Sequence, residues 1–355
     1  MNDLLTALSC NLYEQRLDAV KNTQVTLAKR PKGKPQPSDF AVVESETVAL
    51  SEGQALVKNL YVSLDAGFRN WMDEDSGDDV LPAMPLGQAV MGLVLGKVVE
   101  SRNEKIEVGR LLMARLAWEE YSLVDDSDWL VTIDDDQQPL SYHMGVLGDT
   151  GMSAYFGLTD IGKPQPGETV LISAAGGAVG SIAGQIAKIM QARVVGFAGS
   201  DEKCKRLVDE LGYDAAINYK SDDLEAQLER ACPNGIDVYF DNVGGPLLEV
   251  VLNHIAVGAR IPFCGAVADY SAGGSGGGAG NLFQLVTQCA KLQGFLTHTQ
   301  VDRYPEARQQ LSEWLASGQL ISHEQMYQGV EQCGIAFSDL FAGNNFGKTV
   351  VKVSA

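Results

Sequence analysis

The segment from Thr169 to Lys188 constrains the fold of this chain most strongly, because an apolar strand pattern passes through small residues into a helical pattern. The spacing Ala175-x-Gly177-x-x-Gly180 is typical of a turn whose backbone amides approach a pyrophosphate at the N-terminus of a helix. Gly184 lies in the helical part, where a glycine lets the helix pack closely on a sheet. An ordinary tight strand-to-helix turn is the alternative interpretation. The pattern favours a dinucleotide-binding turn with the candidate contact residues Ala175, Gly177, Ala178, Val179 and Gly180.

Composition sets limits on the size of the protein and on its partners. The chain of 355 residues is long enough for two domains, and its 45% hydrophobic content is ample for two cores. A formal net charge of -19 argues against a nucleic-acid partner, because such proteins present a basic face to phosphates. No stretch approaches the roughly 20 uninterrupted apolar residues of a membrane span. The first residues also lack a basic start followed by an apolar core, so we expect a cytoplasmic protein that binds no membrane.

Cysteine and histidine usage predicts no metal site. The six cysteines contain no Cys-x-x-Cys pair, which argues against a disulfide framework or a structural zinc site. We expect them to be reduced and mostly buried thiols. The four histidines occur in no ligand spacing.

The chain changes character near Gly145, which predicts two domains. Before this point, strand-like segments such as 54–64, 89–100 and 111–124 alternate with turn residues, which favours a mostly β domain. After it, strands and helices alternate, which predicts a doubly wound parallel sheet and hence an α/β protein. The expected strands here are 169–175, 193–198, 215–219, 236–241, 260–264 and 294–296, with helices at 178–190, 201–211, 222–231, after Pro246 and at 281–292. A last strand, 347–353, is expected to return to the first domain, so we predict a substrate domain of residues 1–145 and 320–355 and a cofactor domain of residues 146–319.

Two further segments have distinctive patterns. The N-terminal residues carry Leu4, Leu5, Leu8 and Leu12 at helical spacing, and we expect an amphipathic helix that docks on this protein or on a second copy of it. The stretch 273–280 is rich in glycine, which predicts a mobile loop that serves either as a linker or as a lid over the active site.

The end of the second strand of the parallel sheet indicates which cofactor binds. Enzymes that use NAD commonly place an acid there to hold the ribose hydroxyls, whereas this chain reads Gly196-Phe197-Ala198-Gly199-Ser200. Without a carboxylate at this tip, a 2'-phosphate fits beside Gly199 and Ser200, and Lys203 can neutralise it. The acids Asp201 and Glu202 leave the alternative open that this is only a helix start capped by Ser200. The pattern favours NADPH over NADH.

Several motifs together resemble the zinc-independent medium-chain dehydrogenase/reductases, specifically the group of prostaglandin reductases, leukotriene B4 dehydrogenases, alkenal double-bond reductases and curcumin reductases. The resemblance covers nearly the whole chain beyond Thr23. The matching stretches are Leu27-Ala28-Lys29-Arg30-Pro31, Val62-Ser63-Leu64-Asp65, Trp118-x-Glu120-Tyr121, Gly145-Val146-Leu147-Gly148, Ser153-Ala154-Tyr155, Gly199-Ser200-Asp201-Glu202-Lys203, Ile217-Asn218-Tyr219-Lys220, Asp241-Asn242-Val243-Gly244-Gly245 and Asn345-Phe346-Gly347-Lys348.

The resemblance implies a GroES-like, mostly β substrate domain beside a Rossmann cofactor domain, and a homodimer. It further implies that Lys203 and Tyr219 contact the 2'-phosphate of NADPH, and that Asn242 and Asn345 hold the nicotinamide half. Taken singly, each of these residues also has an ordinary structural interpretation. Lys203 and Tyr219 can be a solvated helix lysine and a strand-end aromatic residue, and Asn242 and Asn345 can be a turn former and a hairpin residue.

Two zinc-ligand positions of the wider family differ in this chain. Where zinc-containing relatives have Cys-x-x-Asp, this chain has Val62-Ser63-Leu64-Asp65, and where they have Gly-His-Glu it has Gly87-Gln88-Ala89. Without a Lewis acid to lower the pKa of an alcohol, direct alcohol oxidation is not expected.

The resemblance implies an NADP-dependent oxidoreductase that reduces small α,β-unsaturated carbonyl compounds, by hydride transfer to the β-carbon. Negative charge then collects on the carbonyl oxygen, and a preorganised hydrogen-bond donor must stabilise it. The candidate catalytic donor is Tyr270, with a loop aromatic residue as the alternative interpretation. A quinone oxidoreductase and a non-catalytic NADPH-binding redox sensor are the other two hypotheses.

The chain departs from the family pattern at two places near the expected pocket. It reads Asp65-Ala66-Gly67-Phe68-Arg69 where relatives have Asp-Pro-Tyr-Met-Arg, so a pocket tyrosine is absent. It also reads Gly148-Asp149-Thr150-Gly151 where they have Gly-Met-Pro-Gly, which predicts a carboxylate near the nicotinamide. Asp65 and Arg69 are expected to form a structural i, i+4 ion pair.

Overall fold

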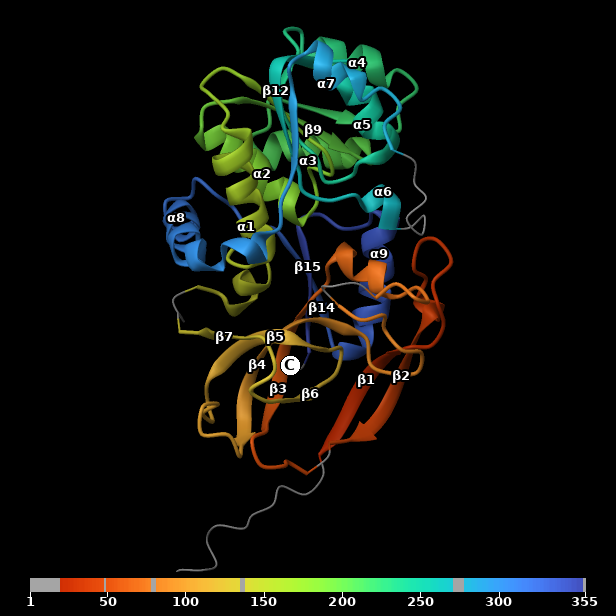
Figure 1. Cartoon of the computed structure of the whole chain (residues 1–355), viewed down its shortest axis with the longest axis vertical. Helices are drawn as coiled ribbons and strands as arrows, with labels where there is room; N and C mark the ends of the chain where they lie inside the picture. Colours follow the sequence, from red (N-terminus) through yellow and green to blue (C-terminus); the bar gives the residue numbers. More distant parts are fainter. Residues whose placement is uncertain (1–19, 48, 78–80, 135–137, 271–277, 354–355) are drawn as a thin grey trace, which may run out of the picture.

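The computed structural model describes residues 20–47, 49–77, 81–134, 138–270 and 278–353 (Figure 1). The expected N-terminal amphipathic helix and most of the glycine-rich stretch lie outside these residues. Within the described chain, a parallel sheet wrapped by helices stands above a mostly antiparallel sheet, so the α/β fold class is confirmed (Figure 1).

The upper sheet has six parallel strands among the described residues, in the order β10-β9-β8-β11-β12-β13. The chain order reverses between β8 and β11, which divides the sheet into the two halves of a doubly wound nucleotide-binding fold. The strands are β8 (Thr169–Ile172), β9 (Arg193–Ala198), β10 (Ala215–Asn218), β11 (Ile236–Phe240), β12 (Ile255–Phe263) and β13 (Lys291–Gly294).

Helices cover both faces of this sheet because the buried strands are apolar on both sides. In β8, Val170 and Ile172 pack into one core together with residues of α2 and α3, whereas Leu171 packs into the opposite core with residues of α4 and α5. The helices are α1 (Asp149–Phe156), α2 (Ala178–Ile189), α3 (Asp201–Leu211), α4 (Leu224–Ala231), α5 (Gly245–Leu252), α6 (Val267–Tyr270), α7 (Phe283–Thr287), α8 (Tyr304–Ala316) and α9 (Cys333–Ala342), with short η helices at Pro37–Asp39, Ala66–Trp71, Leu140–Met144, Gly157–Gly162, Thr297–Arg303 and Val330–Gln332.

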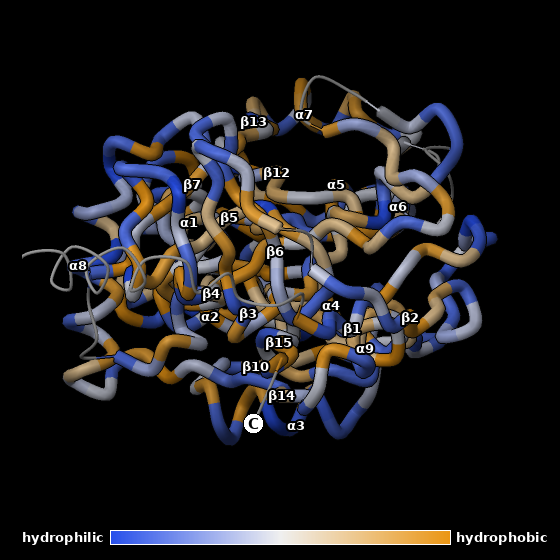
Figure 2. The backbone as a smooth tube through the Cα atoms, turned by 90° about the horizontal axis from the view of Figure 1, so that it is seen from below, coloured by the Kyte–Doolittle hydropathy of each residue, from blue (hydrophilic) through white to orange (hydrophobic). Residues whose placement is uncertain are grey.

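The lower sheet is mostly antiparallel and forms the β-rich part of the molecule. Its order is β14-β15-β3-β4-β5-β7, with β6 paired to β3, and β1 and β2 form a separate antiparallel pair. In the view from below, hydrophobic stretches run through the centre of this part and hydrophilic ones dominate the outer turns (Figure 2). The strands are β1 (Lys21–Leu27), β2 (Phe40–Glu46), β3 (Ala55–Ser63), β4 (Met91–Ser101), β5 (Leu111–Ala117), β6 (Tyr121–Val124), β7 (Leu130–Ile133), β14 (Glu324–Gln328) and β15 (Lys348–Lys352).

The last strand, β15, pairs antiparallel with β3, which confirms that the end of the chain returns to the first sheet. Just before β15, the chain contacts the turn that follows β8 of the upper sheet. The Gly347 amide donates to the Gly176 carbonyl at 2.9 Å. Gly177 and Gly347 also form an isolated parallel bridge. The two sheets therefore meet at the turn that follows β8. The predicted domain boundaries stay a prediction.

Two neighbouring predicted elements are wrong. The sequence predicts a helix over 281–292 and a strand over 294–296, but α7 is only five residues long and β13 already begins at Lys291. The helix ends because Cys289 takes a left-handed backbone conformation with φ 51°, and because β12 pairs with Lys291–Gly294. Pairing with the neighbouring strand outweighs the local helical pattern here.

Candidate functional site

The turn between β8 and α2 has the geometry that the glycine spacing predicts. Gly177 precedes α2 as its N-cap residue and has no side chain to cap the helix, so the first amides of α2 are available to a ligand. A Cβ atom on Gly180 would lie 2.4 Å from the Ala174 carbonyl oxygen, and one on Gly184 would lie 2.0 Å from the Tyr213 hydroxyl. Glycine is therefore required at Gly180 for the turn to close, and at Gly184 it leaves room for the buried Tyr213 side chain.

The tips of β9 and β10 form a cationic cluster beside this turn. A Cβ on Gly199 would lie 3.4 Å from the Tyr219 hydroxyl and 3.5 Å from Lys220 Nζ. Burial, followed by the nearby charges of Lys220 and Arg206, lowers the pKa of Lys203, which is half-buried on α3. Because Lys203 and Lys220 form no ion pair among the described residues, this cluster suits a dianionic phosphate.

Ser200 takes the structural role that the sequence left open. Its hydroxyl accepts the Lys203 amide at 3.3 Å and caps α3. Asp201, the acid nearest the strand tip, accepts the Asn218 side-chain amide at 2.8 Å and is thereby turned toward β10.

The segment before β15 closes over the glycine turn. Asn345 is buried, and its side-chain amide donates to the Gly347 carbonyl at 3.3 Å. The Phe346 ring lies 3.3 Å from the place of a Cβ on Gly176, and the Arg206 guanidinium stands 3.8 Å above the centroid of that ring. Arg206 thus links α3 to the segment that carries Asn345.

Asn242 follows β11 and is held by two hydrogen bonds to Ser173 at the end of β8. Its backbone amide donates to the Ser173 hydroxyl at 2.8 Å, and its side-chain amide donates to the Ser173 carbonyl at 2.8 Å. These bonds fix the orientation of the buried Asn242 side chain. Its side-chain oxygen Oδ1 is left as the group that can accept a hydrogen bond from a ligand.

Tyr270 ends α6 and faces the short helix Ala66–Trp71 of the lower part. It packs against the lower core, as Phe68 and Trp71 of that short helix also do. The Ala266 amide donates to the Tyr270 hydroxyl oxygen at 3.2 Å. Burial raises the pKa of Tyr270, so the hydroxyl keeps its proton near neutral pH.

The Asp65–Arg69 ion pair expected from the sequence is wrong. Asp65 pairs instead with the buried Lys348 ammonium, which also donates to the Leu64 carbonyl at 3.0 Å. Arg69 pairs with Asp73 at 2.8 Å. The reason is that Asp65 precedes the short helix Ala66–Trp71 and lies beside Lys348, which the pairing of β15 with β3 brings next to it.

Asp149 begins α1 close to the ion pair of Asp65 and Lys348. Its carboxylate accepts the Tyr304 hydroxyl of α8 at 3.2 Å. Burial, followed by the nearby charge of Asp65, raises the pKa of Asp149. The carboxylate predicted near the pocket therefore bonds to a tyrosine.

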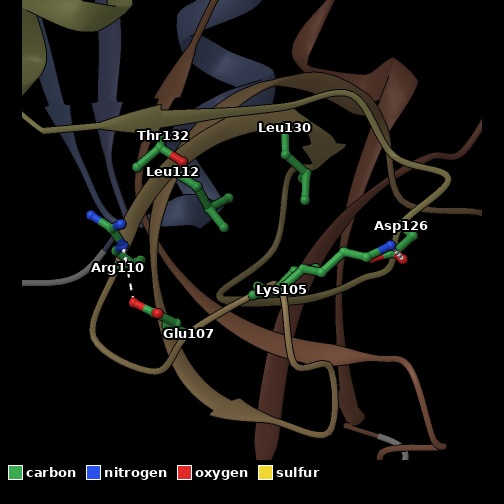
Figure 3. Close-up of a pocket in the computed structure, with 8 residues that line it drawn as sticks. Lys105, Glu107, Arg110, Leu112, Asp126, Leu130 and Thr132 are labelled. Atoms are coloured by element: carbon green, nitrogen blue, oxygen red, sulfur yellow. Dashed lines mark hydrogen bonds and ion pairs between the residues drawn. The ribbon is translucent and has the colours of Figure 1, made fainter.

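A separate hollow of about 350 Å³ lies in the lower sheet and contains none of the predicted site residues (Figure 3). Its charged residues are paired with one another, Lys105 with Asp126 and Arg110 with Glu107. Within the described parts of the chain, no group of three or more His, Cys, Asp or Glu side chains is placed to hold a metal ion.

The structure thus gathers most predicted residues around one turn: the glycine turn, the tips of β9 and β10, and the segments that carry Asn242 and Asn345. Sequence reasoning assigned no role to Lys220 or Arg206. Lys220 follows Tyr219 directly, and a basic residue at a strand tip was the available signal. The sequence carries no signal for Arg206, because its contact with Phe346 joins segments that are far apart in the chain.

Two family models match the chain. One, described as the N-terminal domain of oxidoreductase, matches residues 23–132, and the other, described as zinc-binding dehydrogenase, matches residues 178–317. The chain is 45% identical over 334 residues to YfmJ of Bacillus subtilis, named as an NADP-dependent oxidoreductase, which covers 93% of this chain and 97% of that one. It is 39% identical over 342 residues to the NADP-dependent 2-alkenal reductase of Nicotiana tabacum, covering 95% and 99% of the two chains.

Solved structures share the whole architecture. The crystal structure of CurA from Vibrio vulnificus in complex with NADPH has a TM-score of 0.86 and 37% identity, covering 94% of this chain and 99% of that one. The Escherichia coli quinone oxidoreductase complexed with NADPH has a TM-score of 0.71 at 20% identity, a likeness that shows the fold alone.

Proposed function

The chain belongs to the zinc-independent medium-chain dehydrogenase/reductases as an NADP-dependent oxidoreductase, and from this premise we propose that it reduces the carbon-carbon double bond of α,β-unsaturated aldehydes and ketones. Such a substrate is a small molecule with an electron-poor β-carbon. The 2-alkenal reductase of Nicotiana tabacum supports this class by its name and by similarity over nearly the whole chain.

The residues around the glycine turn fit NADPH as the cofactor. The open N-terminus of α2 suits the pyrophosphate. The ammonium groups of Lys203 and Lys220, which form no ion pair with any described residue, suit the 2'-phosphate beside Tyr219. Asn242 follows β11, in the second half of the sheet, and Asn345 belongs to the segment that closes over the glycine turn. Both would hold the nicotinamide half.

The observation that carries the proposal is the position of Tyr270 between the two parts of the molecule. Its hydroxyl oxygen accepts the Ala266 amide, and the hydroxyl can donate its hydrogen to a substrate oxygen. NADPH, when bound, supplies hydride to the β-carbon of the substrate. Tyr270 then stabilises the enolate oxygen by hydrogen bonding, and a proton from water or from a tyrosine adds to the α-carbon to complete the reduction.

Steady-state turnover of Tyr270→Phe tests this role. We expect kcat for an alkenal to fall about 100-fold, the usual effect of removing one oxyanion donor. The Kd for NADPH should change little, because the hydroxyl is not needed to hold the cofactor. Tyr61→Phe, in a cluster on the lower sheet that does not contain Tyr270, is the control and should turn over like the unaltered protein. Undiminished turnover by Tyr270→Phe would remove the tyrosine from the mechanism.

A substrate panel tests the reaction class. Purified protein is given NADPH with an alkenal, an aryl enone and a quinone, and the products are identified by mass spectrometry. Saturation of the double bond supports the proposal. Turnover of the quinone alone would assign a quinone oxidoreductase, and tight NADPH binding without turnover would assign a redox sensor.

We also propose that the protein is a homodimer. The supporting observation is β13, an edge strand of the upper sheet whose four residues are all exposed. None of the helices in the described parts of the chain is long and apolar enough to cross a membrane. The cytoplasmic location stays a prediction.

A further inference from the structure

A buried carboxylate lies at the end of β11, beside the proposed cofactor site. Asp241 has no exposed surface, and its Oδ1 accepts the Tyr239 hydroxyl at 2.9 Å and the Ser173 hydroxyl at 3.0 Å. The same oxygen accepts the amides of Val243 at 2.9 Å and Gly244 at 3.0 Å. Oδ2 is buried and has no hydrogen-bond partner in the described part of the chain.

No cation within the described ranges of the chain pairs with this carboxylate. None of the ion pairs formed by the described residues includes Asp241. Burial raises the pKa of the Asp241 carboxyl, whereas the amides and hydroxyls that donate to it act in the opposite direction. An added positive charge nearby would act together with these donors and keep the group ionised.

The sheet topology places Asp241 on the nicotinamide side. Lys203 and Lys220 mark the adenosine half of the site, at the tips of β9 and β10. In a doubly wound sheet the dinucleotide crosses the point where the strand order reverses, so its other half lies over the ends of β11 and β12. Asp241 is the residue that follows β11 directly, and Asn242 is next to it.

Hydride transfer creates a positive charge on this side. The β-carbon of the substrate gains a hydrogen with both electrons of the broken C–H bond of NADPH, and the nicotinamide ring is left as a cation in NADP+. We propose that the Asp241 carboxylate stabilises this cation and so favours hydride donation from NADPH to substrate. Electrostatic attraction is weakly screened in a protein interior, so the carboxylate can act without touching the ring. The inference rests on the proposed function for the direction of transfer.

A purely structural role is the competing explanation. The turn after Asp241 also holds α6 through two backbone hydrogen bonds. The backbone carbonyl of Asn242 accepts the Val267 amide at 3.3 Å, and that of Val243 accepts the Ala268 amide at 3.1 Å. Asp241→Asn separates the two roles, because the amide oxygen can still accept the four donors while the charge is gone.

Binding of the two cofactor forms tests the proposal without any turnover. Kd values for NADP+ and NADPH are measured by calorimetry on the full chain and on Asp241→Asn. We expect the ratio of Kd for NADP+ to Kd for NADPH to rise about tenfold in the variant. Asp241→Ser, which keeps an acceptor without a charge, serves if Asp241→Asn does not fold. Tyr239→Phe removes one donor but keeps the carboxylate, and its ratio should stay near that of the unaltered protein.

The outcomes separate this inference from the proposed function. A folded uncharged variant with an unchanged ratio would overturn the role of Asp241, even if enones are reduced normally. A shifted ratio in a protein that turns over no enone would support Asp241 and remove the substrate class.

Discussion

At the scale of single residues, we propose that the cationic cluster makes the site prefer NADPH over NADH. Lys203 comes from α3, and Tyr219 and Lys220 come from the residues after β10. Tyr219 and Lys220 approach Gly199, and the charge of Lys220 acts on Lys203. The sequence predicts Lys203 and Tyr219 from their motifs. It does not predict Lys220, because its approach to Gly199 depends on how the chain turns after β10.

Charge removal at these lysines predicts a cofactor-specific loss. Each of Lys203→Ala and Lys220→Ala should weaken NADPH binding about tenfold, since each removes a charge-assisted contact to the 2'-phosphate. NADH binding should stay unchanged because NADH lacks this phosphate. Calorimetric titration with both cofactors measures the effect. Lys205→Ala, an exposed lysine on the same helix that pairs with Asp209, is the matched control. Equal losses for NADPH and NADH would place the 2'-phosphate elsewhere.

At the scale of elements, local signals predicted the structure well where they act alone. Helix α3 spans Asp201–Leu211 as expected, because Ser200 caps its start and Gly212 ends it in a left-handed conformation. The glycine turn also has the predicted geometry, because the contacts that require Gly180 are made within the turn itself, to Ala174 and Ala175. The failures, α7 and the Asp65–Arg69 pair, depend on strand pairing and on a lysine from the end of the chain. Of the four donors to Asp241, the Ser173 hydroxyl could not be predicted for the same reason, because β8 and β11 meet only in the fold.

The contact between α1 and α8 predicts a pH-dependent stability. Burial raises the pKa of Asp149, so the folded protein binds this proton more tightly than the unfolded chain does. The ionised carboxylate therefore costs stability once the pH rises above the unfolded value of 3.8, and the cost grows until the folded pKa is passed. Asp149→Asn removes this cost and keeps the acceptor for Tyr304. We expect its melting temperature to rise by about 2 °C at neutral pH and to stay nearly unchanged near pH 4.

Thermal melting across this pH range provides the measurement for Asp149. Tyr304→Phe is the control, since it removes the donor and leaves the carboxylate. It should lower the melting temperature, most strongly at neutral pH, where Asp149 is ionised. A gain for Asp149→Asn that is the same at both pH values would show that its proton is not bound more tightly in the fold.

At the scale of the whole molecule, the exposed edge of the upper sheet is the feature that needs a partner. A bare edge strand presents unpaired backbone groups, and natural proteins usually cover or block such edges. Next to β13, α7 exposes Phe283 and Val286, the latter 65% accessible, and Leu296 is also exposed. An apolar rim beside an open strand is the composition of an association surface rather than of a solvated one.

A second copy of this chain is the occupant that we expect, because pairing β13 with its own counterpart extends both sheets symmetrically. Light scattering should therefore give twice the 38.1 kDa mass of one chain. Val286→Glu buries a charge in this interface and should shift the protein to monomers at micromolar concentration. Val108→Glu changes an equally exposed valine, 62% accessible, in the lower part of the molecule and should leave the dimer intact. A monomeric unaltered protein would exclude this interface, and a Val286→Glu dimer would move it away from β13. Tyr270 ends α6, which follows β12, the strand next to β13. Comparing kcat of the monomeric variant with that of the dimer therefore also tells whether the site is complete within one chain.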